Sequence, residues 1–371
     1  MAWGFVNSTS DTSLFLKFNG SDSLFLLVYV DDILITGSDS GAINKLISTL
    51  HNTFALKTLG QVNFFLGFEA FRDSTGLYLT QSKYVLDLLK KTNMLESKPI
   101  DTPIAAGTKL SLSDGIAFSD PTLYRSTVGA LQYLTNTRPD ISFVVNKLSQ
   151  FLAAPTLVHW QACKRVLRYI KGTPHIGLWF QAASVFSLEA FSDADRASCI
   201  DDCRSTSGNC VLLGGNLISW SSRKQRVVAR SSTEAEYRSM AQVTTDVIWL
   251  RSLLHELRIP VVGCPVVWCD NIGANSLSQN PVFHQCTKHI DIDTHFIREK
   301  VLAGEIDTRY VPTAHQIADI LTKGFSRDRF QFLCAKLNLV ASPQFSLRED
   351  DKPIDSSSKL SASIAEHNFY E

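Results

Sequence analysis

The chain has 371 residues, 44% of them hydrophobic, which predicts two or three domains with ordinary cores. Lysine plus arginine and aspartate plus glutamate both number 36, so there is no gross basic excess of the kind that marks many nucleic-acid-binding proteins. The last 31 residues carry three basic and six acidic side chains, so the remainder is slightly basic and compatible with a nucleic-acid partner. The sequence shows neither a signal-peptide pattern nor an apolar run of about 20 residues, which predicts an intracellular protein of cytoplasm or nucleus without a membrane span.

The first segment, residues 1–80, reads as a strand-rich α+β region. Two apolar runs, LFLLVYV and ILITG, flank Asp31 and Asp32 and predict a hairpin with these carboxylates at its turn. Residues 42–54 have apolar side chains at a helical period. A second hairpin is predicted around 73–76.

Residues 81–175 read as helical. The helix HWQACKRVLRYIKGT carries Lys164, Arg168 and Lys171 on a face separate from its apolar residues. A solvated face is one interpretation of this spacing, and a helix that contacts nucleic-acid phosphates is the other.

Residues 176–338 alternate strands and helices, which predicts an α/β domain with a mixed five-stranded sheet. The acidic, serine-rich segment 339–371 is predicted to be a disordered tail.

Four carboxylates of residues 176–338 stand at the ends of strands or the starts of helices. They are Asp193 after SLEAFS, Glu234 in SSTEAEY, Asp270 after VVWC and Asp319 in HQIADILTK. In an α/β sheet these positions converge on one rim. Clustered carboxylates repel one another unless cations fill the site, and oxygen-only ligands favour Mg²⁺ or Mn²⁺. Two such ions can activate a water and stabilise the leaving oxygen of a phosphodiester.

Each of these residues also has an ordinary structural interpretation. Glu234 and Glu236 both follow a serine or threonine at the S/T-x-x-E spacing of a capping box, with Ser231 and Thr233. Asp270 with Asn271 could form a turn, and Asp319 could offset a helix dipole in a first turn. The whole set in this order of elements favours a site over chance.

A zinc site is a further alternative. The eight cysteines form no CxxC pair, which is typical of reduced thiols. Between residues 264 and 295 the sequence gathers several sulfur and imidazole ligands, although their spacing fits no compact four-ligand knuckle. These residues are Cys264, Cys269, His284, Cys286, His289 and His295.

Six motifs in the sequence, three in each half, make the chain resemble copia-type LTR retrotransposon Pol polyproteins. FSDADRASCIDDCRSTSGNCVLLGG, VWCDNIGANSLSQ and YVPTAHQIADILTKGF resemble their ribonuclease H domain. LLVYVDDILITGSD, LGQVNFFLGFEA and YRSTVGALQYLTNTRPDISFVVNKLSQFL resemble their reverse transcriptase palm and thumb or connection. The resemblance covers residues 10–340 and divides the chain into a partial palm (1–80), a helical thumb or connection (81–175) and a ribonuclease H-like domain (176–338).

The resemblance implies chemistry for the acidic residues. Asp193, Glu234, Asp270 and Asp319 would be the ligands of two Mg²⁺ or Mn²⁺ ions in an enzyme that cuts RNA in RNA–DNA hybrids. Asp31 and Asp32 would be polymerase metal ligands, and LGQVNFFLGFEA would help to hold the primer. His315 is a candidate for proton transfer, and Asp195 is a neighbour of the site. Partners would be the hybrid and other products of the same polyprotein.

The sequence also departs from the family pattern. Arg196 stands where the family shows tryptophan, and Cys203 and Cys286 stand where it shows arginine. A further palm aspartate is expected upstream of YVDD, yet only Asp11 and Asp22 precede Asp31, both in turn-like contexts. Hybrid cleavage by residues 176–338 is therefore the first hypothesis. RNA-directed DNA polymerisation, with missing segments supplied by another chain, and a degenerate fragment that only binds nucleic acid are the alternatives.

Overall fold

The computed structural model describes residues 2–54, 56–279, 291–342 and 363–368. The chain forms two compact units. Unit 1 consists of residues 1–79, 249–260 and 343–371, and unit 2 of residues 80–248 and 261–342. No helix in the described ranges is long and apolar enough to cross a membrane.

Unit 1 is built on a six-stranded sheet with the order β1-β2-β3-β4-β16-β5. The strands β2, β3 and β4 form an antiparallel meander, and Tyr29 pairs with Asp32 across the turn. The bounds are β1 (Val6–Asn7), β2 (Leu14–Asn19), β3 (Asp22–Tyr29), β4 (Asp32–Gly37), β5 (Lys57–Gln61) and β16 (Ser363–Asn368). A short hairpin of β6 (Phe64–Phe65) and β7 (Phe68–Asp73) follows β5, and β8 (Gly76–Thr80) ends this part of the chain.

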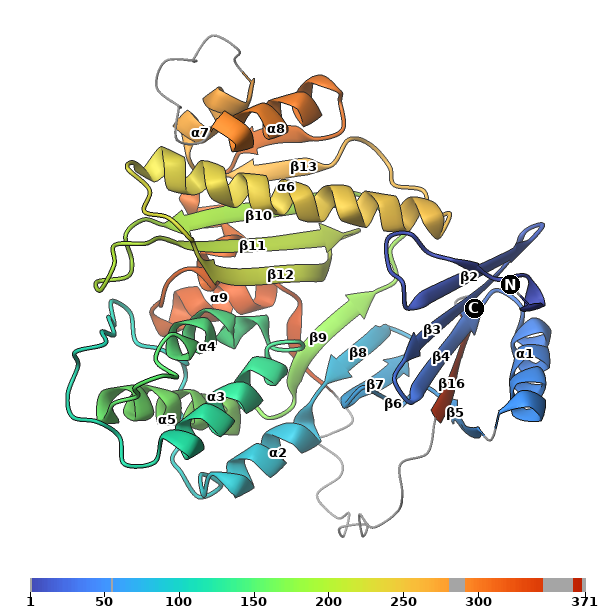
Figure 1. Ribbon diagram of the computed structural model, residues 1–371, viewed down its shortest axis with the longest axis horizontal. Coiled ribbons are helices and arrows are strands. Elements are labelled where there is room, and N and C mark those ends of the chain that lie inside the picture. The colour runs from blue at the N-terminus through green and yellow to red at the C-terminus, as the bar shows by residue number, and fades with distance from the viewer. Residues whose placement is uncertain (1, 55, 280–290, 343–362, 369–371) are drawn as a thin grey trace. The chain divides into compact units, whose positions relative to one another are not determined.

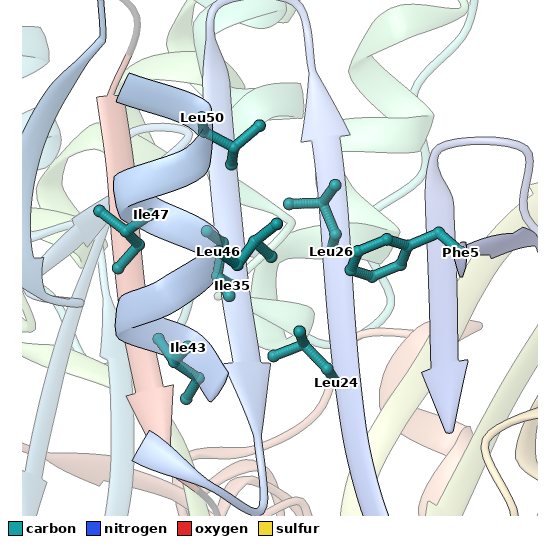
Figure 2. Packing of buried hydrophobic residues seen from close by; sticks show 8 residues of the cluster. All are labelled: Phe5, Leu24, Leu26, Ile35, Ile43, Leu46, Ile47 and Leu50. Carbon is teal, nitrogen blue, oxygen red and sulfur yellow. The ribbon is translucent and has the colours of Figure 1, made fainter. Parts of the chain in front are cut away.

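Helix α1 (Ser40–Thr53) covers one face of this sheet. Its start is set by Asp39, whose carboxylate accepts hydrogen bonds from the backbone amides of Gly41 and Ala42. The helix presents a stripe of aliphatic residues to the sheet, as Figure 2 shows. The resulting core contains Phe5, Leu24, Leu26, Ile35, Ile43, Leu46, Ile47 and Leu50. The apolar runs on both sides of Asp31 and Asp32 are therefore explained by packing beneath one helix.

The predicted disordered tail needs correction at two places. Residues Leu339–Ala341 form β15, which pairs antiparallel with β9 (Ile176–Gln181). Residues Ser363–Asn368 form β16, which lies parallel between β4 and β5 (Figure 1). Residues Ser363–Asn368 are ordered as a strand because their backbone pairs with β4 on one side and β5 on the other, and so fills the place between these two strands. Composition alone carries no signal for such a long-range pairing.

The helices of unit 2 surround a buried ion pair. Arg138 and Asp140 lie 2.8 Å apart with almost no exposed surface, and the Tyr169 hydroxyl donates to Asp140 over 2.6 Å. Arg138 also donates to the carbonyl oxygen and hydroxyl of Thr173, which ties the end of α5 to this pair. The helices are α2 (Ser82–Lys91), α3 (Pro121–Leu134), η2 (Pro139–Ile141), α4 (Ser142–Ser149) and α5 (Leu157–Gly172).

The second part of unit 2 is a mixed five-stranded sheet with the order β12-β11-β10-β13-β14. The strands β10, β11 and β12 are antiparallel, whereas β13 and β14 extend the sheet parallel to β10. This confirms the predicted mixed five-stranded α/β domain. Its strands are β10 (Leu188–Asp195), β11 (Thr206–Leu213), β12 (Asn216–Lys224), β13 (Val266–Cys269) and β14 (Asp307–Tyr310). Its helices are α6 (Ser232–Glu256), α7 (Ile272–Gln279), α8 (Asp291–Leu302), η3 (Thr313–His315), η4 (Ile317–Leu321) and α9 (Arg327–Lys336).

The predicted boundary at residue 175 falls inside one compact unit. Helix α4 packs against the edge strand β12, and the Trp220 indole donates to the carbonyl oxygen of Thr135 over 3.0 Å. Helix α6 runs along β10 and β13 in Figure 1, and its last residues belong to unit 1. There the carboxylate of Glu256 accepts hydrogen bonds from the amides and hydroxyls of Thr9 and Ser10.

Replacing Asp140 by alanine should lower the free energy of unfolding by about 3–5 kcal/mol, because the guanidinium of Arg138 would remain buried without its carboxylate. Urea unfolding followed by circular dichroism measures the change. The double variant R138M/D140A removes both charges and should lose less stability than Asp140→Ala alone. A single variant as stable as the wild type would show that the pair is not the source of stability.

Candidate active site

Strand β10 and the short helix η4 bring two of the predicted carboxylates together. Asp193 pairs with Gly208 of β11, and η4 packs directly over that glycine. A Cβ atom at residue 208 would lie 2.6 Å from Thr322 Cγ2 and 2.8 Å from Leu321 Cβ. Only glycine therefore lets η4 approach the sheet closely enough for Asp319 to lie beside Asp193.

Both carboxylates are almost fully buried, with exposed fractions of 3% for Asp193 and 1% for Asp319. The Thr322 hydroxyl donates to Asp193 Oδ2. The ammonium of Lys323 lies 2.6 Å from Asp319 Oδ1 and 3.7 Å from Asp193 Oδ2. Arg329 reaches Asp319 Oδ2 from the other side over 3.4 Å. The two carboxylates thus share one lysine in the ion-free protein.

The third and fourth carboxylates come from α6 and from the end of β13. Oxygens of Glu236 and Asp270 lie with the sulfur of Cys269 within 4.8 Å of one another, a spacing that could hold a metal ion. The Cys269 thiol donates to Glu236 Oε2 over 3.8 Å, and the Thr313 hydroxyl donates to Asp270 Oδ2 over 2.9 Å. Helix α6 is fixed to the sheet here, because the Ser239 hydroxyl donates to the carbonyl oxygen of Asp193.

The electrostatics show that these groups form one cluster. Burial, together with the negative charges of Asp193 and Asp270, raises the pKa of Glu236 to about 9. Burial also raises the pKa of Asp193 and of Asp270. The charge of Asp319 raises the pKa of Asp193 further, and the charge of Asp193 raises that of Asp270. Burial alone would lower the pKa of Lys323, but Asp193 and Asp319 raise it overall. A proton at Glu236 and the ammonium of Lys323 therefore offset part of the negative charge of the cluster.

The structure brings Glu236, and not the predicted Glu234, to the cluster. The Glu234 carboxylate accepts from the backbone amide of Arg230 and from the guanidinium of Arg238, and its own amide is capped by the Ser231 hydroxyl. Glu234 thus has the capping role that the sequence left open. The two residues differ in their partners, because Glu236 faces the Cys269 thiol whereas Glu234 faces Arg230 and Arg238.

His315 and Asp195 lie near the cluster in the chain. His315 ends η3 with an exposed side chain, four residues before Asp319. Asp195 is the last residue of β10, and burial raises its pKa while Lys323 opposes the shift. Proton transfer by His315 stays a prediction.

The two aspartates of unit 1 have a different environment. Asp31 is exposed within the two-residue turn between β3 and β4, and Asp32 begins β4 with partial exposure. Val30, the other turn residue, has a φ of 50°, which a β-branched residue rarely adopts. The segment LGQVNFFLGFEA spans the end of β5 and the β6–β7 hairpin, so a hairpin lies where the resemblance places a primer contact.

The basic residues predicted on α5 are partly engaged within unit 2. The Arg168 guanidinium donates to the carbonyl oxygen of Lys98 over 2.7 Å, which anchors the loop after α2. Lys164 and Lys171 are partly exposed. Contact of this face with phosphates stays a prediction.

The residues of the zinc alternative lie partly within the described ranges. His284, Cys286 and His289 lie outside the described residues. The Cys264 thiol faces the carbonyl oxygen of Gly304, whereas Cys269 faces Glu236, so these two cysteines have separate surroundings.

Comparison with known proteins agrees with the sequence motifs. A family described as reverse transcriptase (RNA-dependent DNA polymerase) matches residues 1–106. The Retrovirus-related Pol polyprotein from transposon RE1 of Arabidopsis thaliana is 51% identical over 340 residues, which are 92% of this chain and 23% of the relative. The corresponding polyprotein from transposon TNT 1-94 of Nicotiana tabacum is 38% identical over 90% of this chain and 26% of its own length.

The chain belongs to the copia-type retrotransposon Pol family. It spans about a quarter of the length of these polyproteins. Among solved structures, this Pol-family chain is similar to the ribonuclease H1 LC11, crystallised in complex with an RNA/DNA hybrid. That similarity has a TM-score of 0.29 and 15% sequence identity, over 37% of this chain and 94% of LC11.

The residues of the cluster fit a divalent metal by their own chemistry. Four carboxylates from β10, α6, the end of β13 and η4 meet here, and burial raises the pKa of Asp193, Glu236 and Asp270. Hard oxygen ligands of this kind suit Mg²⁺ or Mn²⁺. Cys269 is the exception, since burial raises the pKa of its thiol well above the usual range, and a protonated thiol is a poor ligand.

The stability of the ion-free protein should fall as the pH rises above 4.5, towards the Glu236 pKa of about 9. In this range the unfolded chain has Glu236 ionised while the folded chain keeps the proton, so the folded state binds more protons. One such proton corresponds to at most about 1.4 kcal/mol per pH unit. Thermal unfolding in EDTA at several pH values measures this. Glu236→Gln should give a flatter dependence, and equal slopes for both proteins would rule out the shifted carboxyl.

Proposed function

We propose that unit 2 hydrolyses the RNA strand of RNA–DNA hybrids with the help of two divalent ions. The observation that carries the proposal is the meeting of Asp193, Glu236, Asp270 and Asp319 from four separate elements at one rim of the sheet. Membership of the Pol family and the resemblance of the flanking motifs to a ribonuclease H domain support the same reaction.

The four carboxylates would hold the ions, and Mg²⁺ or Mn²⁺ would activate a water and stabilise the leaving oxygen. The rest of the site positions these ligands. Thr322 orients Asp193 and Thr313 orients Asp270, since each hydroxyl donates to one carboxylate oxygen and leaves the other oxygen available. Arg329 holds the η3 segment by donating to the carbonyl oxygens of Thr313 and Ala314.

Burial of the cluster shapes its chemistry. Asp193 and Asp319 lie in a low-dielectric environment, where a bound cation gains more from each carboxylate than it would in water. Asp270 is half-buried and so lies nearer to solvent, where a phosphodiester can approach. The geometry therefore supports metal-assisted hydrolysis better than passive nucleic-acid binding.

A second candidate function, RNA-directed DNA polymerisation, is favoured by the reverse transcriptase match to residues 1–106 and by the exposed turn that carries Asp31. Two adjacent carboxylates at a hairpin turn are suited to hold ions for phosphoryl transfer, which depends mainly on positioning. Primer extension on an RNA template tests this candidate separately from cleavage.

Purified protein should cleave the RNA of a labelled RNA–DNA hybrid when Mg²⁺ or Mn²⁺ is present and stop when EDTA is added. Asp193→Asn, Glu236→Gln and Asp270→Asn should each reduce the rate by more than roughly 100-fold, beyond the loss typical of an outer-shell partner. Glu234→Gln is the matched comparison on the same helix and should keep near wild-type activity.

The two glutamate variants test which glutamate of helix α6 is needed for cleavage. Loss of cleavage in Glu234→Gln with full activity in Glu236→Gln would exchange their roles. Tight hybrid binding without cleavage by the wild type would instead support the nucleic-acid-binding alternative. Circular dichroism of each variant separates a lost ligand from a lost fold.

A further inference from the structure

Lys323 occupies the place between two carboxylates that a cation would need. Its ammonium lies 2.6 Å from Asp319 and 3.7 Å from Asp193, so one lysine neutralises the two most deeply buried acidic residues of the cluster. The lysine is on the same turn as Asp319, at the i,i+4 spacing. Thr322 and Arg329 add further contacts to the same two carboxylates.

The same ammonium is in a position to leave. About 36% of the Lys323 side chain is exposed, whereas 4% and 2% of the Asp193 and Asp319 side chains are. Its nitrogen already lies 6.0 Å from the centre of the Phe325 ring, near the limit for an attractive contact between a cation and an aromatic ring. A flexible four-carbon stem lets the charge move while the backbone of η4 stays in place.

The Lys323 ammonium and a divalent ion cannot both lie against the carboxylate oxygens of Asp193 and Asp319. A divalent ion at Asp193 and Asp319 and the ammonium of Lys323 would repel each other at such distances. The lysine charge has to be accommodated elsewhere when an ion binds. A nucleic-acid phosphate at the rim provides an anion for it, since lysine binds phosphate as a point charge.

We infer that Lys323 is an internal counter-ion that competes with divalent ions, and that a bound hybrid strengthens ion binding by drawing this ammonium onto its phosphate. The inference rests on the proposed function, because it assumes that hybrid and ions share this site. Lys323 stays protonated throughout and acts as a positioning residue. Ion binding and hybrid binding are then coupled, and each strengthens the other by the same factor.

The experiment is a calorimetric titration of full-length protein with Ca²⁺, with and without a saturating RNA–DNA hybrid. Calcium is used because oxygen ligands bind it, and gel analysis verifies that the hybrid stays intact. Hybrid should tighten ion binding to the wild type by about tenfold, within the usual range of coupling between sites. Lys323→Met should bind the ion tightly already without hybrid and show little further gain.

Lys109→Met is the matched control. Lys109 is exposed, and its charge acts on Asp195 without touching Asp193 or Asp319. If general loss of positive charge were the cause, this control would tighten ion binding as Lys323→Met does. Lys323→Met should also melt at a lower temperature in EDTA than the control variant, because Asp193 and Asp319 lose their shared cation.

Three outcomes would overturn the inference. Equal ion affinity of the wild type and Lys323→Met would show that the lysine does not compete, and metal-dependent cleavage could still stand. An equal gain from hybrid in both proteins would assign the coupling to other residues. Absence of ion binding by either protein, together with absence of cleavage, would contradict this inference and the proposed function together.

Discussion

Repulsion among buried carboxylates is the constraint on which unit 2 depends. Asp193 and Asp319 are almost without solvent, and Glu236 and Asp270 are close enough to raise the pKa values of the cluster. Such a group of negative charges opposes folding unless something neutralises it. The ammonium of Lys323, a proton retained by Glu236 and two threonine hydroxyls offset part of this charge.

This constraint explains features of the backbone that have no obvious role by themselves. Gly208 has no side chain because η4 must pass directly over β11 to bring Asp319 to Asp193. Helix α6 is bound to the backbone of Asp193 through Ser239, which sets the phase that turns Glu236 inwards. The buried pair of Arg138 and Asp140 shows the same principle in the helical part, where a complete set of partners makes buried charge stable.

Sequence reasoning locates the site well where strands end and less well inside helices. Asp270 could be predicted because an apolar, β-branched run stops at it. Asp193 lies within β10, two residues before the end of that strand, and the parallel neighbours β10 and β13 share a rim. Glu234 and Glu236 could not be separated by motif, because both fit the capping spacing with a preceding hydroxyl residue. The hydrophobic periodicity of the following turns would have favoured Glu236. The strand at Ser363–Asn368 had no local signal, since its hydrogen bonds reach residues more than 300 positions earlier in the chain.

The contrast between Asp31 and Asp193 shows why burial decides which carboxylates demand a cation. Asp31 lies at an exposed hairpin turn, where water solvates its charge and the apolar strands beside it pack under α1. Asp193 lies inside the sheet, away from water, so its charge has to be balanced by partners within the protein. The turn with the most recognisable motif therefore leaves its side chains in water, whereas the buried cluster of unit 2 has to be balanced by charges within the protein.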